Sequence, residues 1–125
     1  MLLAERKEVV VQYLLLMYDE PGAYAGVTAD ERRALLDEYG RLSEALVTDG
    51  AFVGANPLEP AANAKTVRVT DGEVRVSDGQ AVESQVTLGG YYLIDVASLD
   101  EAVAWGARMP AARFGPVEVR PVRAA

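Results

Sequence analysis

The pattern of hydrophobic and polar residues divides the chain into alternating strand-like and helix-like segments. Residues 9–18 (VVVQYLLLMY) form a continuous apolar run that is β-branched at its start and ends at the turn sequence DEPG. This length and the breaker behind it predict a buried strand rather than a helix. Residues 1–8 are expected to form a flexible N-terminal extension, so that a single domain covers residues 9–125.

A long helix is predicted after this strand. Thr28 and Glu31 have the spacing of a capping box, and acidic residues at this point favour a helix start. Gly50 is a typical C-terminal stop. Between them, apolar residues recur at helical spacing and form one stripe: Leu35, Leu36, Tyr39, Leu42 and Leu46.

A second, shorter helix is predicted near the C-terminus. Ser98 and Glu101 repeat the capping-box spacing, and Pro110 ends the segment. Its inward face is expected to carry Leu99, Ala102, Val103 and Trp105.

Between the two helices lies the strongest turn signal of the chain, TVRVT-DG-EVRVS. Two alternating segments around an Asp-Gly pair predict a β-hairpin with a two-residue turn. This turn pairs Thr70 with Glu73, Val69 with Val74 and Arg68 with Arg75, which places the valines on one face and the arginines on the other.

Further strands are predicted at residues 51–55, 90–96 and 116–122, with a small polar loop over residues 60–65. Prolines at both ends of the last segment suit an edge strand or a strand end. The resulting order is β-α-β, hairpin, β-α-β. It predicts an α+β domain with the split βαβ, ferredoxin-like plan and the hairpin inserted between its halves.

Composition excludes several kinds of chemistry. The chain has no His and no Cys, so imidazole catalysis, thiol chemistry, disulfides and zinc fingers are ruled out, and no cofactor or metal site is expected. A net charge of −7 argues against direct nucleic-acid binding. No apolar run reaches the roughly 20 residues that span a bilayer. The charged start MLLAERKE lacks the apolar centre of a signal peptide, so a cytoplasmic location is expected.

A set of motifs resembles a known family. YLLLMYDEP, VRVTDGEVRVSDG, LGGYYLIDVASLDEAVAWGARMPAA and VEVRPV, spread over residues 13–122, are similar to the YCII-related family and especially to its branch named for a DGPF motif. The resemblance implies a ferredoxin-like fold that dimerises through its sheets as an α+β barrel. Its members are mostly of unassigned function, and some lie beside alternative sigma factors.

The chain departs from that family pattern in two ways. The signature reads Asp78-Gly79-Gln80-Ala81, so its Pro and Phe are absent, while Asp78, Gly79 and the later Glu83 remain. Some relatives carry a His–Asp pair proposed to be catalytic, and this chain has no His. The missing His argues against an inherited enzyme activity.

Three groups of residues are candidates for a site. Asp78, Glu83 and Asp19 are acids at strand ends, where two close carboxylates could split their pKa values for acid–base chemistry; alternatively, Asp78-Gly79 is simply a turn and Glu83 is solvated. Four tyrosines could orient a small ligand through their hydroxyls or could simply belong to the core: Tyr13, Tyr18, Tyr91 and Tyr92. Strand alternation puts the last two on opposite faces.

The third group is Arg68 with Arg75. Like charges across a strand pair repel, so a carboxylate or a bound anion could compensate for them; alternatively, the guanidinium groups spread into water.

These observations favour a non-catalytic binding or regulatory module for a small ligand or a protein partner. The alternative is a small cofactor-free enzyme, a lyase, isomerase or oxygenase, with Asp78 or Glu83 as base and a tyrosine such as Tyr91 as acid. A third possibility, a partner of a transcription factor, is implied only by the gene neighbours of relatives.

A homodimer is expected because the first strand is apolar on both faces. Among its residues only Gln12 is polar, and two helices can cover only one face of the sheet. The second face would expose a large apolar patch, which association with a second copy would bury.

Overall fold

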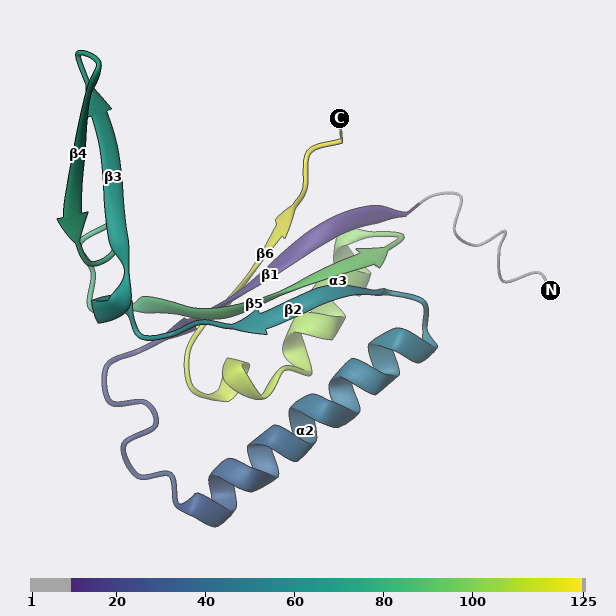
Figure 1. The fold of residues 1–125 in the computed structure, drawn as a ribbon. Helices are drawn as coiled ribbons and strands as arrows, with labels where there is room; N and C mark the ends of the chain where they lie inside the picture. Colours follow the sequence, from purple (N-terminus) through teal and green to yellow (C-terminus); the bar gives the residue numbers. More distant parts are fainter. Residues whose placement is uncertain (1–9, 125) are drawn as a thin grey trace.

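Four antiparallel strands form the central sheet of an α+β fold, whose described part comprises residues 10–124 (Figure 1). The strands are β1 (Val11–Asp19), β2 (Phe52–Pro57), β5 (Thr87–Val96) and β6 (Val117–Pro121), in the order β2-β5-β1-β6. In this computed structural model β2 and β6 are the edge strands, so the expectation of an edge position for the proline-flanked last strand is confirmed. The expected N-terminal extension, residues 1–8, lies outside the described residues.

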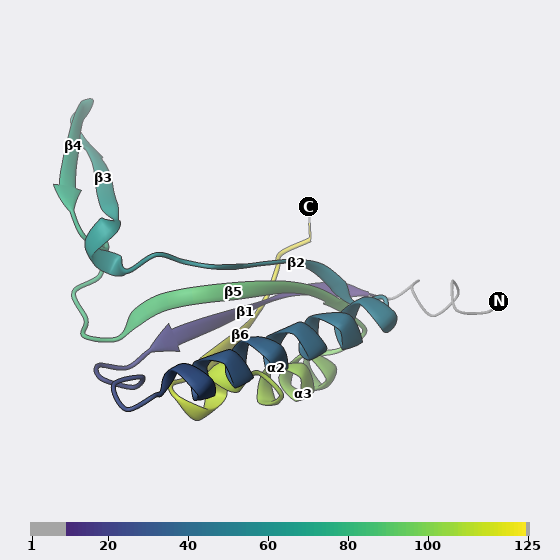
Figure 2. The same cartoon turned by 60° about the horizontal axis from the view of Figure 1, so that its bottom comes forward.

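Two helices cover one face of this sheet (Figure 2). Helix α2 (Ala29–Thr48) begins with the predicted capping box: the Glu31 amide donates to Thr28 Oγ1 at 3.1 Å, and the Thr28 amide donates to Glu31 Oε1 at 2.9 Å. Helix α3 (Leu99–Ala107) is capped by Ser98 and leads into a 3-10 turn, η3 (Pro110–Arg113).

The inward faces of the helices differ in part from the prediction. Leu42 and Leu46 are buried as expected, but Leu36 is 65 % exposed. In α3 the predicted Ala102 is buried and Trp105 packs against the core, as expected, but Leu99 and Val103 are about half exposed. Gly106, which was not predicted, faces the sheet.

The reason for this difference is a close approach of α3 to the sheet. A methyl group on Gly106 would lie 3.4 Å from Val119 Cγ2 and 3.7 Å from Val117 Cγ1. The smallest residues of α3 therefore form its contact with β6, and its larger apolar residues lie at the sides.

The core lies between the helices and one face of the sheet. Its fully buried side chains include Leu15 of β1, Leu46 of α2, Ile94 of β5 and Met109, which follows α3 in the chain. Strand β1 pairs with β5 from Val11–Val96 to Asp19–Thr87, with an irregularity between Met17 and Tyr18. This register places alternate residues of both strands on the covered face and leaves the others on the open face.

The hairpin forms a separate two-stranded sheet, β3 (Lys65–Thr70) and β4 (Glu73–Asp78). The predicted register is confirmed, with Arg68 opposite Arg75 and Thr70 opposite Glu73. Both turn residues, Asp71 and Gly72, have positive φ angles of 51° and 78°, as a two-residue turn requires. Figures 1 and 2 show the hairpin standing out from the sheet on the side opposite to the helices.

Several element boundaries differ from the sequence expectations. Strand β2 continues through Asn56-Pro57, and β5 starts three residues earlier than predicted, at Thr87. The expected loop over residues 60–65 contains a 3-10 turn, η2 (Ala61–Asn63), and its last residue already belongs to β3. No helix within residues 10–124 is long and apolar enough to cross a membrane.

Candidate functional site

The three acids singled out in the sequence occupy different surroundings. Asp78 ends β4, is 84 % exposed and forms an ion pair with Lys65 across the hairpin. Glu83 is exposed in the loop between β4 and β5. Among residues 10–124, no tyrosine hydroxyl forms a hydrogen bond with either carboxylate. Asp19, at the end of β1, is half-buried.

Two of the candidate tyrosines lie on the helix-covered face. Tyr13 and Tyr92 are buried among the core residues, and the Tyr92 hydroxyl shares a hydrogen bond of 2.8 Å with Ser43 Oγ. The surroundings of these two phenols are therefore those of core residues.

The other two candidates lie on the open face. The Tyr18 hydroxyl donates to Glu118 Oε1 at 3.4 Å, and the Tyr91 hydroxyl accepts a hydrogen bond of 2.8 Å from Asn56 Nδ2. Burial alternates along β5, so the prediction that Tyr91 and Tyr92 point to opposite faces is confirmed.

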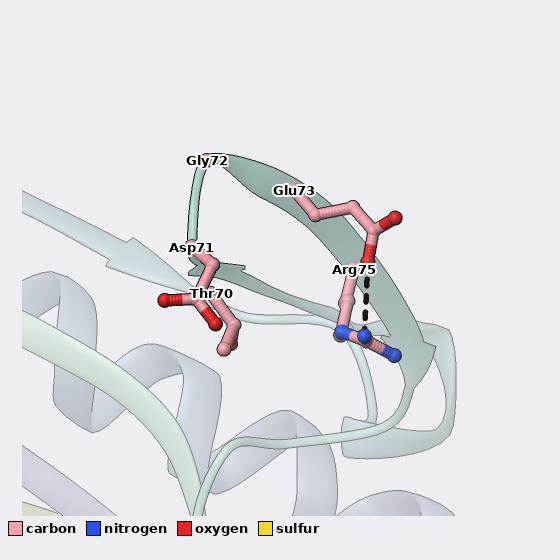
Figure 3. A pocket seen from close by; sticks show the side chains of 5 residues that line it. All are labelled: Thr70, Asp71, Gly72, Glu73 and Arg75. Atoms are coloured by element: carbon pink, nitrogen blue, oxygen red, sulfur yellow. Dashed lines mark hydrogen bonds and ion pairs between the residues drawn. The ribbon is translucent and has the colours of Figure 1, made fainter.

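The arginine pair lies on the exposed hairpin. Arg75 Nη2 is 2.9 Å from Glu73 Oε1, so a carboxylate of the same strand compensates the charge of Arg75. A shallow hollow of about 420 Å³ lies beside this ion pair near the hairpin tip (Figure 3). All of its lining residues are exposed, which makes it a solvated surface feature: Thr70, Asp71, Gly72, Glu73 and Arg75.

Asp19 has the most unusual electrostatic surroundings of the three acids. Partial burial raises the pKa of its carboxyl above the ordinary aspartate value. Within the described part of the chain, no hydrogen bond or ion pair to this carboxylate is found. A desolvated carboxylate without a donor is unfavourable for folding, and such groups are concentrated at functional sites.

The negative charge of Asp19 contributes to raised pKa values of two tyrosines. Burial raises the pKa of Tyr24, and the Asp19 charge raises it further. Burial also raises the pKa of Tyr39 to about 12, with smaller contributions from Tyr24, Tyr92 and Asp19 that act in the same direction.

Both phenols are held in place by neighbouring groups. The Tyr24 ring stacks on Phe114 at 4.6 Å between centroids. The Tyr39 hydroxyl accepts a hydrogen bond of 3.0 Å from the Ala111 amide. The candidate site is therefore the group formed by Asp19, Tyr24 and Tyr39.

Gly89 of β5 makes room for the Asp19 side chain, and the neighbouring Gly90 makes room for Met17. A Cβ atom on Gly89 would lie 2.3 Å from Asp19 Oδ2, and one on Gly90 would lie 2.9 Å from Met17 Cε. The Asp19 carboxylate thus lies directly against the β5 backbone, at the irregularity in the β1–β5 pairing.

Sequence reasoning named Asp19 but missed Tyr24 and Tyr39. Tyr39 was assigned only to the apolar stripe of α2, and Tyr24 lies in the connection between β1 and α2. The one signal that points to this place is the pair Gly89-Gly90 inside a strand, because glycine there often marks a bulge or a close approach.

No group of three or more acidic residues within residues 10–124 is placed to hold a metal ion. The arrangement around Asp19 offers one carboxylate and aromatic surfaces. Its physical properties suit a small ligand that has hydrogen-bond donors or a positive charge.

Comparison with known proteins confirms the resemblance at the level of the YCII-related family. The model of the YCII-related domain matches residues 11–125, and the chain belongs to that family. It is also 31 % identical over 112 residues to the uncharacterized protein R00369 of Rhizobium meliloti (strain 1021). That match covers 88 % of this chain and 90 % of the relative.

Proposed function

We propose that this protein is a non-catalytic, dimeric module that binds a small ligand, with Asp19 as its polar anchor. The observation that carries the proposal is the half-buried Asp19 carboxylate, whose pKa is raised by burial and to which no donor is found within residues 10–124. A ligand with an amine or amidine group would supply the missing donor and could also contact the aromatic rings beside it.

The same proposal interprets the fold as ferredoxin-like, because β5 lies between β1 and β2 in the sheet, as in a split βαβ unit. It includes a homodimer formed through the open face, which we define as the sheet surface carrying Leu14, Leu16, Tyr91 and Leu93. These four side chains are half-buried, and β1 and β5 bring them together as the pairs Leu14–Leu93 and Leu16–Tyr91. An apolar surface at the centre of a sheet favours association with a second copy.

Asp19→Asn tests the ligand site, and Glu20→Gln is the matched control because it removes one negative charge from the exposed neighbour. Small amines and amidines are screened by thermal-shift measurement. Compounds that stabilise the wild-type protein are expected to stabilise the Glu20→Gln variant equally and to lose their effect on the Asp19→Asn variant. Stabilisation of Asp19→Asn by the same compounds would refute the assignment of Asp19.

A second measurement needs no ligand. Because burial raises the pKa of Asp19, its charged form destabilises the fold at pH 7, and Asp19→Asn is expected to raise the melting temperature there. The gain should shrink as the pH falls through the folded-state pKa, since the wild-type carboxyl then becomes neutral. A lower melting temperature at pH 7 would mean that the carboxylate stabilises the fold and is not held free for a ligand.

Sedimentation equilibrium at micromolar concentration tests the dimer. A mass near twice 13.4 kDa is expected for the wild-type protein. Leu16→Glu places a charge on the open face and should give a monomer, whereas Leu36→Glu changes an exposed residue of α2 and should remain a dimer. A wild-type mass near that of one chain would refute the dimer.

The enzyme alternative, with Asp78 or Glu83 as base and Tyr91 as acid, stays a prediction. It requires a buried carboxylate within reach of a tyrosine hydroxyl, whereas the side chains of Asp78 and Glu83 are both exposed. The role as a partner in transcription regulation also stays a prediction.

A further inference from the structure

The hairpin carries an apolar surface that the described part of its own chain leaves open. We call this surface, made of four valines, the valine face: Val67, Val69, Val74 and Val76. Their exposed fractions lie between 60 % and 65 %, and they pair across the strands as Val67–Val76 and Val69–Val74. Exposed contiguous apolar surface of a few hundred Å² is a typical mark of an interaction site.

The hairpin also lacks support from the main sheet. Strands β3 and β4 pair only with each other among the strands of residues 10–124. An isolated two-stranded hairpin is marginally stable in water. The Asp-Gly turn and the ion pair of Arg75 with Glu73 support its geometry, but they leave its apolar face in solvent.

The direction of the hairpin points to its partner. Figures 1 and 2 show that it rises on the side of the sheet opposite to the helices, which is the side of the open face. Six residues per strand make it roughly 20 Å long, and two sheets packed face to face lie about 10 Å apart. A second copy on the open face would therefore lie within the height of the hairpin.

We propose that the valine face packs against the second subunit of the homodimer, so that each subunit holds its partner with one hairpin. This inference rests on the dimer proposed above and names the surface that completes its interface. A stable homodimer buries about 800 Å² or more on each partner. The open face contributes four half-buried side chains, and the valine face supplies a further exposed apolar area on a hairpin that rises on the same side of the sheet.

The opposite face of the hairpin fits a solvated position. It carries Arg68 and Arg75, and Arg75 is already paired with Glu73 on the same strand. The four central positions of the first face are valine, with the Lys65–Asp78 ion pair only at its base, whereas Arg68, Arg75 and Glu73 lie together on the second. A central apolar area with charge at its rim is typical of an interface.

Because the chain has no cysteine, single labels can be placed without background. A nitroxide at Val69→Cys reports on the valine face, and one at Arg68→Cys is the matched control on the opposite face. In the dimer the first label is expected to be immobilised and the second mobile. In the Leu16→Glu background, where the subunits separate, both labels should be mobile.

Replacing all four valines by threonine keeps their shape and β-branching and removes their apolar character. This variant should dimerise at least tenfold more weakly than the wild-type protein, and the control Arg68→Gln/Arg75→Gln should stay within threefold. Circular dichroism checks that the variants retain the fold.

The outcomes separate this inference from the proposed dimer. A wild-type monomer refutes both. A dimer in which the Val69 label is mobile, or in which the threonine variant associates like the wild-type protein, refutes only the role of the hairpin. A Val69 label that stays immobile in the Leu16→Glu monomer also refutes it, because another part of the same chain would then cover the valine face.

Discussion

Gly115 offers a sharp test of the packing that holds β6 beside β1. A Cβ atom on this residue would lie 2.2 Å from the backbone oxygen of Tyr18. Since such atoms are essentially never found closer than 3.0 Å, Gly115→Ala requires the two segments to separate by about 0.8 Å. The obstacle is a backbone carbonyl, which cannot rotate away as the end of a side chain could.

The size of the effect follows from what this separation disturbs. The Tyr18 amide donates to the Pro116 carbonyl at 3.0 Å, one residue from the clash. Loss of that bond contributes about 1 kcal/mol, and overpacking adds about 1–3 kcal/mol. The lower chain entropy of alanine in the unfolded state offsets about 0.4–1 kcal/mol. We expect a net loss of about 1–3.5 kcal/mol in the free energy of unfolding.

Urea denaturation measures this loss, and Gly40→Ala is the control. Gly40 lies in α2 with nothing within 4 Å of the added atom, so alanine should stabilise the protein by up to about 1 kcal/mol through helix propensity. The two substitutions are chemically identical and should have opposite signs. A change of less than about 0.5 kcal/mol in the stability of Gly115→Ala would refute the close approach of the Gly115 and Tyr18 backbones.

Three further predictions concern helix capping, pH and the hairpin. Thr28→Ala removes the α2 cap and should lower the free energy of unfolding by about 1 kcal/mol in the same titration. The Arg113 guanidinium donates to Glu38 at 2.7 and 3.1 Å and lowers the pKa of that carboxyl. This ion pair should stabilise the fold above the ordinary glutamate pKa and lose its effect as the pH falls, so the melting temperature of Glu38→Gln should depend less on acid than that of the wild-type protein. Arg75→Glu breaks an exposed ion pair and should change stability by less than about 1 kcal/mol; a larger loss would show that Arg75 meets a structural partner.

The hairpin and the helix caps could be predicted from the sequence because local chemistry determines them. An Asp-Gly pair accepts two consecutive positive φ angles, and a two-residue turn of this kind determines the register of the β3–β4 pair without any tertiary contact. Thr28 and Glu31 likewise satisfy each other within a single turn. Neither feature depends on where the rest of the chain lies.

Features that depend on distant contacts were predicted less well. Helical spacing identified an apolar set in α3, but the close packing of Gly106 on β6 turned Leu99 and Val103 to the side. The surroundings of Asp19 are of the same kind. They require the irregular β1–β5 pairing at Gly89 and the packing of α2, which bring phenols from separate segments under the influence of one carboxylate.

The charge of the protein gives the proposed interface a distinctive salt dependence. Two subunits that each carry a net charge of −7 repel one another, and this repulsion weakens when salt shortens the Debye length from about 30 Å at 0.01 M to about 3 Å at 1 M. The apolar contribution of an interface of leucine, tyrosine and valine side chains is not reduced by this screening. Dimerisation should therefore become tighter as sodium chloride is raised, as measured by sedimentation equilibrium. Weaker association at high salt would instead show that ion pairs between the subunits hold the dimer together, and the apolar open face would then not be its main contact.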